Sequence, residues 1–114
     1  LYAALRGAAA TGYGGLIFDD SHWLLSFSPE VFVALSGSEA KVKPMKGTRP
    51  RMADPAADAA MAQELATSVK DRAENLMIVD LMRNDLSRVA EAGSVHVDAP
   101  FAVESYPTVH QMVS

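Results

Sequence analysis

The sequence predicts an α+β fold in which helices pack on a mainly antiparallel sheet. Short apolar runs, broken by Gly, Asp-Asp-Ser and Ser-Pro, fill residues 12–35 and are typical of strands joined by turns. Residues 55–93 are rich in Ala, Leu, Met and Glu, and alternation of apolar and polar residues resumes after Gly93. Because strands precede and follow the helices without βαβ alternation, we expect mainly antiparallel strands.

The expected elements follow from these patterns in chain order. Strands are expected at residues 16–18, 24–27, 31–35 and 39–43. Two helices are expected within residues 55–93, with Asp54 or a neighbour as N-cap and a break near residues 68–70. The second helix should run from about residue 71 to about residue 90, with Gly93 as its C-terminal stop. A 3-4-3-4 spacing predicts that five residues of this helix share one face, namely Asp71, Glu74, Ile78, Leu81 and Asp85.

Length, composition and charge limit the class of protein. A chain of 114 residues, 49% of them hydrophobic, can bury the core of one domain. The net charge of -4 argues against a general nucleic-acid binder, and the absence of cysteine excludes disulfides. Without a targeting signal or an apolar run of the roughly 20 residues that span a bilayer, a cytoplasmic protein is expected. The chain begins in helix-like LYAALR and stops after strand-like VHQMVS, so residues 1–114 are expected to be part of a longer domain.

The segment VKPMKGTRPR, residues 42–51, contains four cationic side chains and no acidic one. Its two prolines predict a stiff loop at the end of a strand. One interpretation is a nucleophilic lysine, Lys46, because nearby cations favour the uncharged amine that a nucleophile requires. The other is a solvated or anion-binding patch. Gly47 allows close approach of the backbone to a ligand, and Thr48 adds a hydroxyl donor, so both fit an anion site.

Several acidic residues are candidates for proton transfer or metal binding. Glu30 follows an apolar strand and a proline, where a carboxylate is either without function or a general acid or base. Asp71 and Glu74 fit an exposed first helical turn, or part of a carboxylate site of the kind that Mg²⁺ uses. Asp80 interrupts the apolar run MIVDLM, and we expect it to pair with Arg83 or a neighbouring group.

The three histidines lack the mutual spacing of a zinc site. Of the three, His110 alone lies near a dense motif, within the strand-like run at the end of the chain. An isolated histidine on a strand is either structural or a ligand contact, and its residue type alone does not decide between them.

Four segments in this order, SFSPEVF, VKPMKGTRPR, KDRAENLMIVDLMRNDLSRVAEAGSV and VESYPTVHQMVS, resemble the chorismate-binding enzymes. The resemblance implies the anthranilate synthase component I-like fold, of which this chain would be an internal piece. The P-x-K-G-T form with lysine resembles the branch of the family that aminates chorismate at C4 in p-aminobenzoate and folate synthesis. Anthranilate synthases carry alanine at that position. Another chorismate enzyme, such as an anthranilate, isochorismate or salicylate synthase, is one alternative, and a noncatalytic anion-binding domain is another.

The resemblance also implies roles for the acidic and basic candidates. Lys46 is expected to add to C2 of the chorismate ring, and Glu30 to protonate the departing C4 hydroxyl. Glu74 is expected to bind Mg²⁺, which holds a substrate carboxylate, with Asp71 as an outer helper. The reaction is that of a transferase that receives ammonia from a glutamine amidotransferase partner.

Substrate contacts are implied for Gly47 and Thr48, which belong to the same motif as the lysine, and for His110. Members of the family commonly carry a histidine directly before the final hydrophobic-Val-Ser sequence. This chain has Gln111 at that position and His110 one residue earlier. Because neighbouring residues of a strand point to opposite faces, the two positions are not equivalent.

Overall fold

The expected mixture of helices and antiparallel strands is present in the computed structural model, which describes residues 1–9 and 11–114. All strand pairs among these residues are antiparallel. The chain divides into two compact units, Leu1–Lys41 and Val42–Ser114, where the sequence predicts a single domain. None of the described helices is long and apolar enough to cross a membrane.

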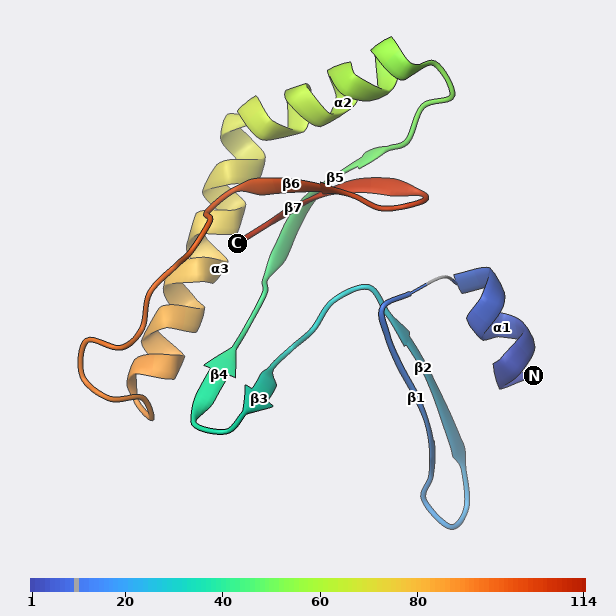
Figure 1. The fold of residues 1–114 in the computed structure, drawn as a ribbon, viewed down its shortest axis with the longest axis vertical. Coiled ribbons are helices and arrows are strands. Elements are labelled where there is room, and N and C mark those ends of the chain that lie inside the picture. The colour runs from blue at the N-terminus through green and yellow to red at the C-terminus, as the bar shows by residue number, and fades with distance from the viewer. Residues whose placement is uncertain (10) are drawn as a thin grey trace. The chain divides into compact units, whose positions relative to one another are not determined.

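The N-terminal unit is built from one short helix and two hairpins (Figure 1). Helix α1 spans Tyr2–Ala9. Strand β1, Tyr13–Phe18, pairs along its whole length with β2, Trp23–Ser28. The three-residue strands β3, Ala34–Ser36, and β4, Glu39–Lys41, form the second hairpin.

The strand expected at 31–35 is wrong over its first part, because β3 begins only at Ala34. A local turn precedes it. The hydroxyl of Ser28 accepts a hydrogen bond from the amide of Glu30 and donates one to the carbonyl of the same residue. This turn occupies the backbone in local hydrogen bonds instead of strand pairing. The fourth expected strand, 39–43, is present but ends at Lys41.

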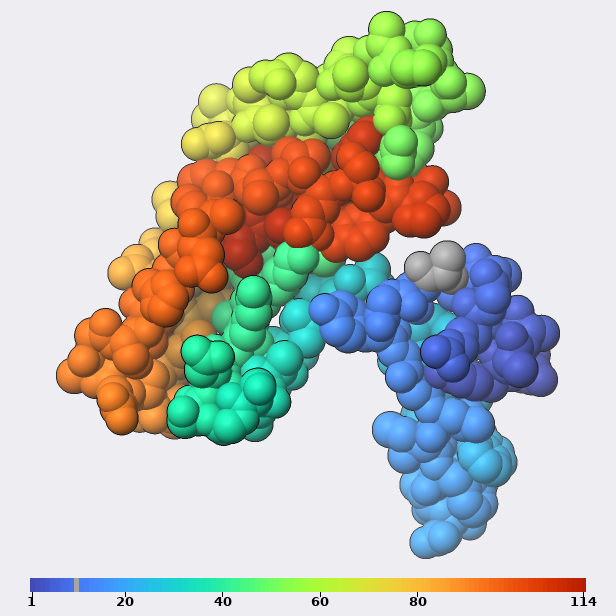
Figure 2. Space-filling model, in the orientation of Figure 1, coloured from blue at the N-terminus to red at the C-terminus, as the bar shows by residue number. Residues whose placement is uncertain are grey.

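Both faces of the β1–β2 hairpin expose large apolar side chains. Ile17 and Phe18 are adjacent on β1, so they point to opposite faces, and they are 58% and 50% exposed. Their partners on β2, Leu24 and Trp23, are 57% and 60% exposed. Figure 2 shows the far end of this hairpin projecting past α1. The described residues of the N-terminal unit therefore leave a two-sided apolar surface uncovered.

The C-terminal unit is a three-stranded antiparallel sheet, of order β5-β7-β6, with two helices (Figure 1). Its strands are β5, Met45–Pro50, β6, Ala102–Ser105, and β7, Val109–Val113. Helix α2, Pro55–Thr67, contacts all three strands, and α3, Val69–Ser87, contacts β5 and β7. Leu65 of α2 and Met112 of β7 are fully buried in the core of this unit.

The break between the two helices was predicted correctly. Ser68 ends α2 and is the N-cap of α3, where its hydroxyl accepts a hydrogen bond from the amide of Asp71. Asp54 caps α2 as expected, accepting from the amide of Ala57 at 2.9 Å. The expected C-terminal stop is wrong, because α3 ends at Ser87, before the predicted glycine. Local capping chemistry therefore sets both helix starts.

The face predicted for the second helix is only partly right. The buried residues of α3 are Asp71, Asn75 and Val79, spaced by four, whereas Glu74 is exposed. Asp80 lies 3.4 Å from Arg83 with its side chain 61% exposed, which confirms the expected pairing and removes the predicted cost of burial. The position of the sheet decides which face of α3 is buried. The sequence of the helix does not reveal that position.

Replacing Leu65 by alanine should destabilise this unit, because the side chain is fully buried against strand β5. We expect the free energy of unfolding to fall by about 2–5 kcal/mol, measured by urea denaturation. Gln63→Ala on the exposed side of α2 is the matched control and should change it by less than about 0.5 kcal/mol. Equal effects of the two changes would contradict the proposed core.

Candidate active site

Lys46 lies on an irregular strand and not in a loop as predicted. Strand β5 pairs with β7 from Met45 to Pro50, but the register shifts between Met45 and Thr48. Their partners are Val113 and Gln111, so Lys46 and Gly47 together oppose the single residue between these two. Such a β-bulge re-aims a side chain. The prediction failed because the paired residues of the partner strand lie 59 to 68 positions away in the sequence.

Gly47 is required by the shape of the bulge. Its φ of +87° is one that residues with side chains rarely adopt, and a Cβ at this position would lie 2.9 Å from Cβ of Asp71 and 2.9 Å from Cδ1 of Leu65. The strand therefore approaches both helices closely at this residue, as only glycine allows.

Three of the four cations in the segment 42–51 are bound to carboxylates. Lys43 Nζ lies 2.7 and 2.8 Å from the two carboxylate oxygens of Glu104 on β6. Arg51 donates two parallel hydrogen bonds to Asp58 of α2, from Nε at 2.9 Å and Nη2 at 2.8 Å. These contacts hold the pKa of Asp58 and that of Glu104 below their usual ranges. The two pairs join β5 and the residues beside it to α2 and β6.

Arg49 forms the largest of these ion-pair groups. Its Nε and Nη2 each donate at 2.8 Å to Glu64 of α2, Nη2 also donates to Asp71 of α3 at 2.9 Å, and Nη1 donates to the carbonyl of Thr48. The hydrogen bond to Glu64, followed by that to Asp71, raises the pKa of Arg49 above its usual range. One guanidinium therefore connects the strand to both helices.

Lys46 differs from the other three cations. Its side chain is exposed, and it forms no hydrogen bond or ion pair with any residue of 1–9 or 11–114. The geometry does not favour the interpretation of the segment as a solvated or anion-binding patch, since carboxylates neutralise three of its four cations. A single available amine remains, on a bulge whose neighbouring residues are buried or half-buried.

Thr48 and Gln111 lie on the sheet face opposite the helices. The register pairs Thr48 with Gln111 and Gln111 with Glu104, so these three side chains form one row across the sheet. Thr48 Oγ1 donates to Oε1 of Gln111 at 3.0 Å. The neighbouring row, Arg49 and His110, contacts α2. The polar row is therefore on the face that α2 and α3 leave uncovered.

His110 lies on the face that packs against α2 and is 2% exposed. Its Nε2 lies 3.0 Å from Oδ1 of Asp58, and its Nδ1 lies 2.8 Å from the hydroxyl of Ser105. Both ring nitrogens thus have protein partners. This geometry favours the structural interpretation of His110, and Gln111 is the residue of β7 beside Thr48.

The adjacent residues Glu74 and Asn75 of helix α3 differ in exposure. Glu74 is exposed, with Lys70 at 3.8 Å, whereas Asn75 is fully buried and accepts a hydrogen bond from the Ser114 hydroxyl at 2.6 Å. Asp71, 8% exposed, has one carboxylate oxygen bound by Arg49. Within residues 1–9 and 11–114 no three His, Cys, Asp or Glu side chains gather to hold a metal ion. Glu74 is thus the more accessible of the two predicted ligands.

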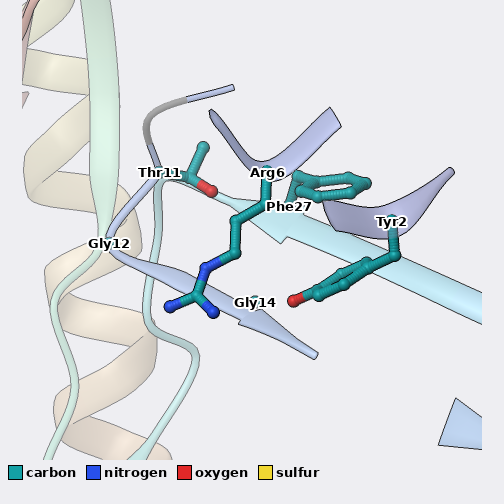
Figure 3. Close-up of a pocket in the computed structure, with 6 residues that line it drawn as sticks. All are labelled: Tyr2, Arg6, Thr11, Gly12, Gly14 and Phe27. Atoms are coloured by element: carbon teal, nitrogen blue, oxygen red, sulfur yellow. The ribbon is translucent and has the colours of Figure 1, made fainter. Parts of the chain in front are cut away.

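Glu30 and a small hollow both belong to the N-terminal unit. Glu30 is exposed in the turn after β2. The hollow, of about 130 Å³, lies between α1 and the hairpin and is lined by Tyr2, Arg6 and Phe27, among others. In Figure 3 the Arg6 guanidinium and the Tyr2 hydroxyl approach each other beside Gly14. No residue predicted from the motifs lines it.

Residues 1–114 match the family described as chorismate binding enzyme. The chain belongs to the chorismate-binding enzyme family. It is 51% identical over 113 residues to aminodeoxychorismate synthase component 1 of Klebsiella aerogenes, covering 99% of this chain and 25% of that protein. It is 58% identical over 91 residues to the protein of the same name from Escherichia coli strain K12, covering 80% of this chain and 20% of that protein.

Anthranilate synthase component I from Streptococcus pneumoniae TIGR4 has a similar solved structure, with a TM-score of 0.78 and 28% identity. The match covers 98% of this chain and 24% of that one. It confirms the expected α+β fold of the family. The chain spans a quarter or less of the length of these relatives.

The sequence motifs did not reveal which carboxylates pair with the cations of the segment 42–51. Glu64, Asp58 and Glu104 hold the cations of the segment 42–51, yet the bonds span 15, 7 and 61 residues. Only the absence of acids within the segment itself indicated that partners had to come from elsewhere. Gln111, in contrast, was identifiable from strand alternation.

Asp58 should make the stability of the C-terminal unit sensitive to acid. Arg51, the Met52 amide and His110 hold its pKa below the usual range, so its contribution is complete above the ordinary aspartate pKa of about 3.9 and is lost as pH falls below it. Asp58→Asn should therefore be less stable than wild type at pH 7 and lose less stability between about pH 5 and pH 3, as measured by urea unfolding.

Asp80→Asn is the control, since it removes the same charge from an exposed carboxylate with one 3.4 Å contact. It should alter the acid limb little. An unchanged acid limb in Asp58→Asn would exclude the Arg51–Asp58 pair as its source.

Proposed function

We propose that the longer protein to which this chain belongs converts chorismate to 4-amino-4-deoxychorismate, the reaction of aminodeoxychorismate synthase component I. The observation that carries the proposal is Lys46, the one cation of its segment without a partner among the described residues, in a chain 51% identical to such a protein. An anion clamp would use several cations, whereas a nucleophile needs one accessible amine.

The proposed chemistry proceeds in two displacements. The uncharged Lys46 amine bonds to C2 of the ring, the ring double bonds shift, and the C4–O bond breaks. Glu30 supplies the proton with which the hydroxyl leaves as water. Ammonia then bonds to C4, the double bonds shift back, and the C2–N bond breaks to return the lysine amine. The two steps replace hydroxyl by amine without an oxidant or reductant.

Gly47 and Thr48 are proposed to lie against the substrate. Thr48 is exposed on the uncovered face of the sheet. The Cβ side of Gly47 is occupied by Asp71 and Leu65, so Gly47 is proposed to meet the substrate through its backbone alone. His110 was expected to contact substrate too, but its burial and its two partners support a structural role instead. Gln111, bonded to Thr48, is on the side proposed for substrate.

Magnesium is proposed to bind through Glu74. Mg²⁺ commonly uses one or two protein carboxylates and completes its coordination with water and substrate, and the exposed Glu74 carboxylate fits a single ligand of that kind. Asp71, one turn earlier and partly engaged by Arg49, would stand outside the first coordination sphere. When bound, the ion supplies positive charge to a substrate carboxylate.

A glutamine amidotransferase subunit is the proposed source of ammonia, and the cytoplasm the proposed location. The number in the relatives' name, component 1, supports a second component. Folate synthesis through p-aminobenzoate would consume the product. A noncatalytic anion-binding domain is less well supported, because three of the four cations are already neutralised.

Lys46→Ala in the full-length enzyme should reduce ammonia-dependent amination by roughly 10³-fold or more, while Mg²⁺-dependent chorismate binding largely survives. Lys46→Arg keeps the charge but places a guanidinium that does not act as an amine nucleophile, so it should be equally inactive. Product formation would be followed by chromatography, and binding by calorimetry.

Mass spectrometry of the wild type, incubated with chorismate and without ammonia, should reveal a substrate adduct on the peptide containing Lys46. An active arginine variant together with no adduct under any trapping condition would refute the covalent role. Formation of anthranilate or isochorismate by the wild type would instead identify another chorismate enzyme.

Glu74→Gln keeps the size of the side chain but removes its charge. Because the proposed ion links Glu74 to a substrate carboxylate, Mg²⁺ and chorismate affinity should fall together, each by at least about tenfold. Titration calorimetry measures both. Unchanged magnesium dependence would remove Glu74 from the site, and Asp80→Asn on the same helix serves as the charge-matched control.

A further inference from the structure

We propose that Asp71 and Arg49 are positioning residues, whose ion pair holds the β5 bulge and thereby fixes the place of Lys46. The inference rests on the proposed function of Lys46 and assigns Asp71 to the strand instead of to a metal. The evidence comes from the bulge, from the helix start and from the guanidinium that joins them.

The bulge by itself leaves two residues of β5 without regular pairing. Lys46 and Gly47 share one opposing residue of β7, so sheet hydrogen bonds do not define their backbone as they define the rest of the strand. Another contact has to supply that constraint if the Lys46 amine is to be held within the small tolerance that a reacting group requires.

Asp71 supplies the contact on the helix side. Its Cβ and Cγ would lie 2.9 and 3.1 Å from a Cβ placed on Gly47, so the aspartate side chain packs directly against the residue that follows Lys46. The position of Asp71 is itself fixed, because its amide donates to the Ser68 N-cap and its side chain is 12% exposed.

Arg49 closes the connection from the strand side. The Arg49 side chain extends from β5 two residues after Gly47. Its Nη2 donates to Asp71 Oδ2 at 2.9 Å, and its Nη1 donates to the carbonyl of Thr48. The backbone from Gly47 to Arg49 is thus held at one end by packing on Asp71 and at the other by a hydrogen bond to it. Lys46, directly before this closed link, has its backbone anchored while its amine remains accessible.

The Asp71 carboxylate meets the guanidinium at 2.9 Å, and the guanidinium is shared with a second acid. Glu64 binds the same guanidinium from α2, but the atoms nearest to a Cβ on Gly47 belong to Asp71 and Leu65, and the Glu64 side chain is 53% exposed. The two acids thus offer a matched comparison, since Asp71 is the one that packs against the bulge at closest range.

The test compares Asp71→Asn with Glu64→Gln in the full-length enzyme. Asp71→Asn should lower kcat, and the rate of adduct formation on Lys46 with ammonia withheld, by about tenfold, since a displacement below 1 Å is enough for such a loss. The KM for chorismate and the Mg²⁺ concentration for half-maximal activity should stay as in wild type. Glu64→Gln should change kcat by less than about twofold, because glutamine still accepts a hydrogen bond from Arg49 and the Arg49–Asp71 bond is kept.

Arg49→Lys is the second variant, for the case that Asp71→Asn unfolds. Lysine keeps the charge but lacks the planar fork that reaches two carboxylates and a carbonyl, so kcat should again fall with KM and magnesium dependence unchanged. Thermal unfolding of all three variants establishes that the folded protein is being compared.

The outcomes are distinguishable. Equal kcat in Asp71→Asn and Glu64→Gln would overturn the positioning role, and a changed Mg²⁺ requirement in Asp71→Asn would assign Asp71 to the metal instead. Adduct formation at the wild-type rate in both Asp71→Asn and Arg49→Lys would also overturn it. If the wild type forms no adduct on Lys46, the proposed function fails, independently of how the variants compare with one another.

Discussion

The guanidinium of Arg49 connects the three elements on which the candidate site is built. It binds Glu64 on α2, Asp71 on α3 and the backbone of its own strand. Strand β5 lies at the edge of its sheet, and its pairing with β7 is interrupted at the bulge, so these bonds add to the contacts that hold it. Burial of Leu65 beneath Gly47 completes the join by apolar packing. Polar contacts at Arg49 and apolar packing at Gly47 therefore hold the same short stretch of β5.

Three of the four cations of the segment 42–51 form ion pairs, and Lys46 forms none with the described residues. Lys43, Arg49 and Arg51 each have a carboxylate partner, and these partners lie on β6, α2 and α3. Because neutralised cations add little to the local field, the exposed amine of Lys46 is the group of this segment that no described carboxylate occupies.

Local chemistry was readable from the sequence, and long-range pairing was not. The caps Asp54 and Ser68 act within three residues of themselves, so the starts of both helices were predictable. Strand β5 was not predicted, because its partner β7 lies 59 to 68 residues away along the chain. The resemblance singled out Lys46 and Glu74, whereas Asp58, Glu64 and Glu104, which bind the other cations of the segment, were not predicted. Strand alternation predicted that Gln111 and His110 point to opposite faces of the sheet.

The positive φ and close contacts of Gly47 limit how this segment can change during evolution. Every single-nucleotide missense change of a glycine codon introduces a side chain with a Cβ, and all such side chains would meet the same helix atoms. Every missense change of this codon is therefore penalised, and a lineage that shortened the bulge would have to alter the strand and both helices together. The exposed lysine beside it can be exchanged without this penalty.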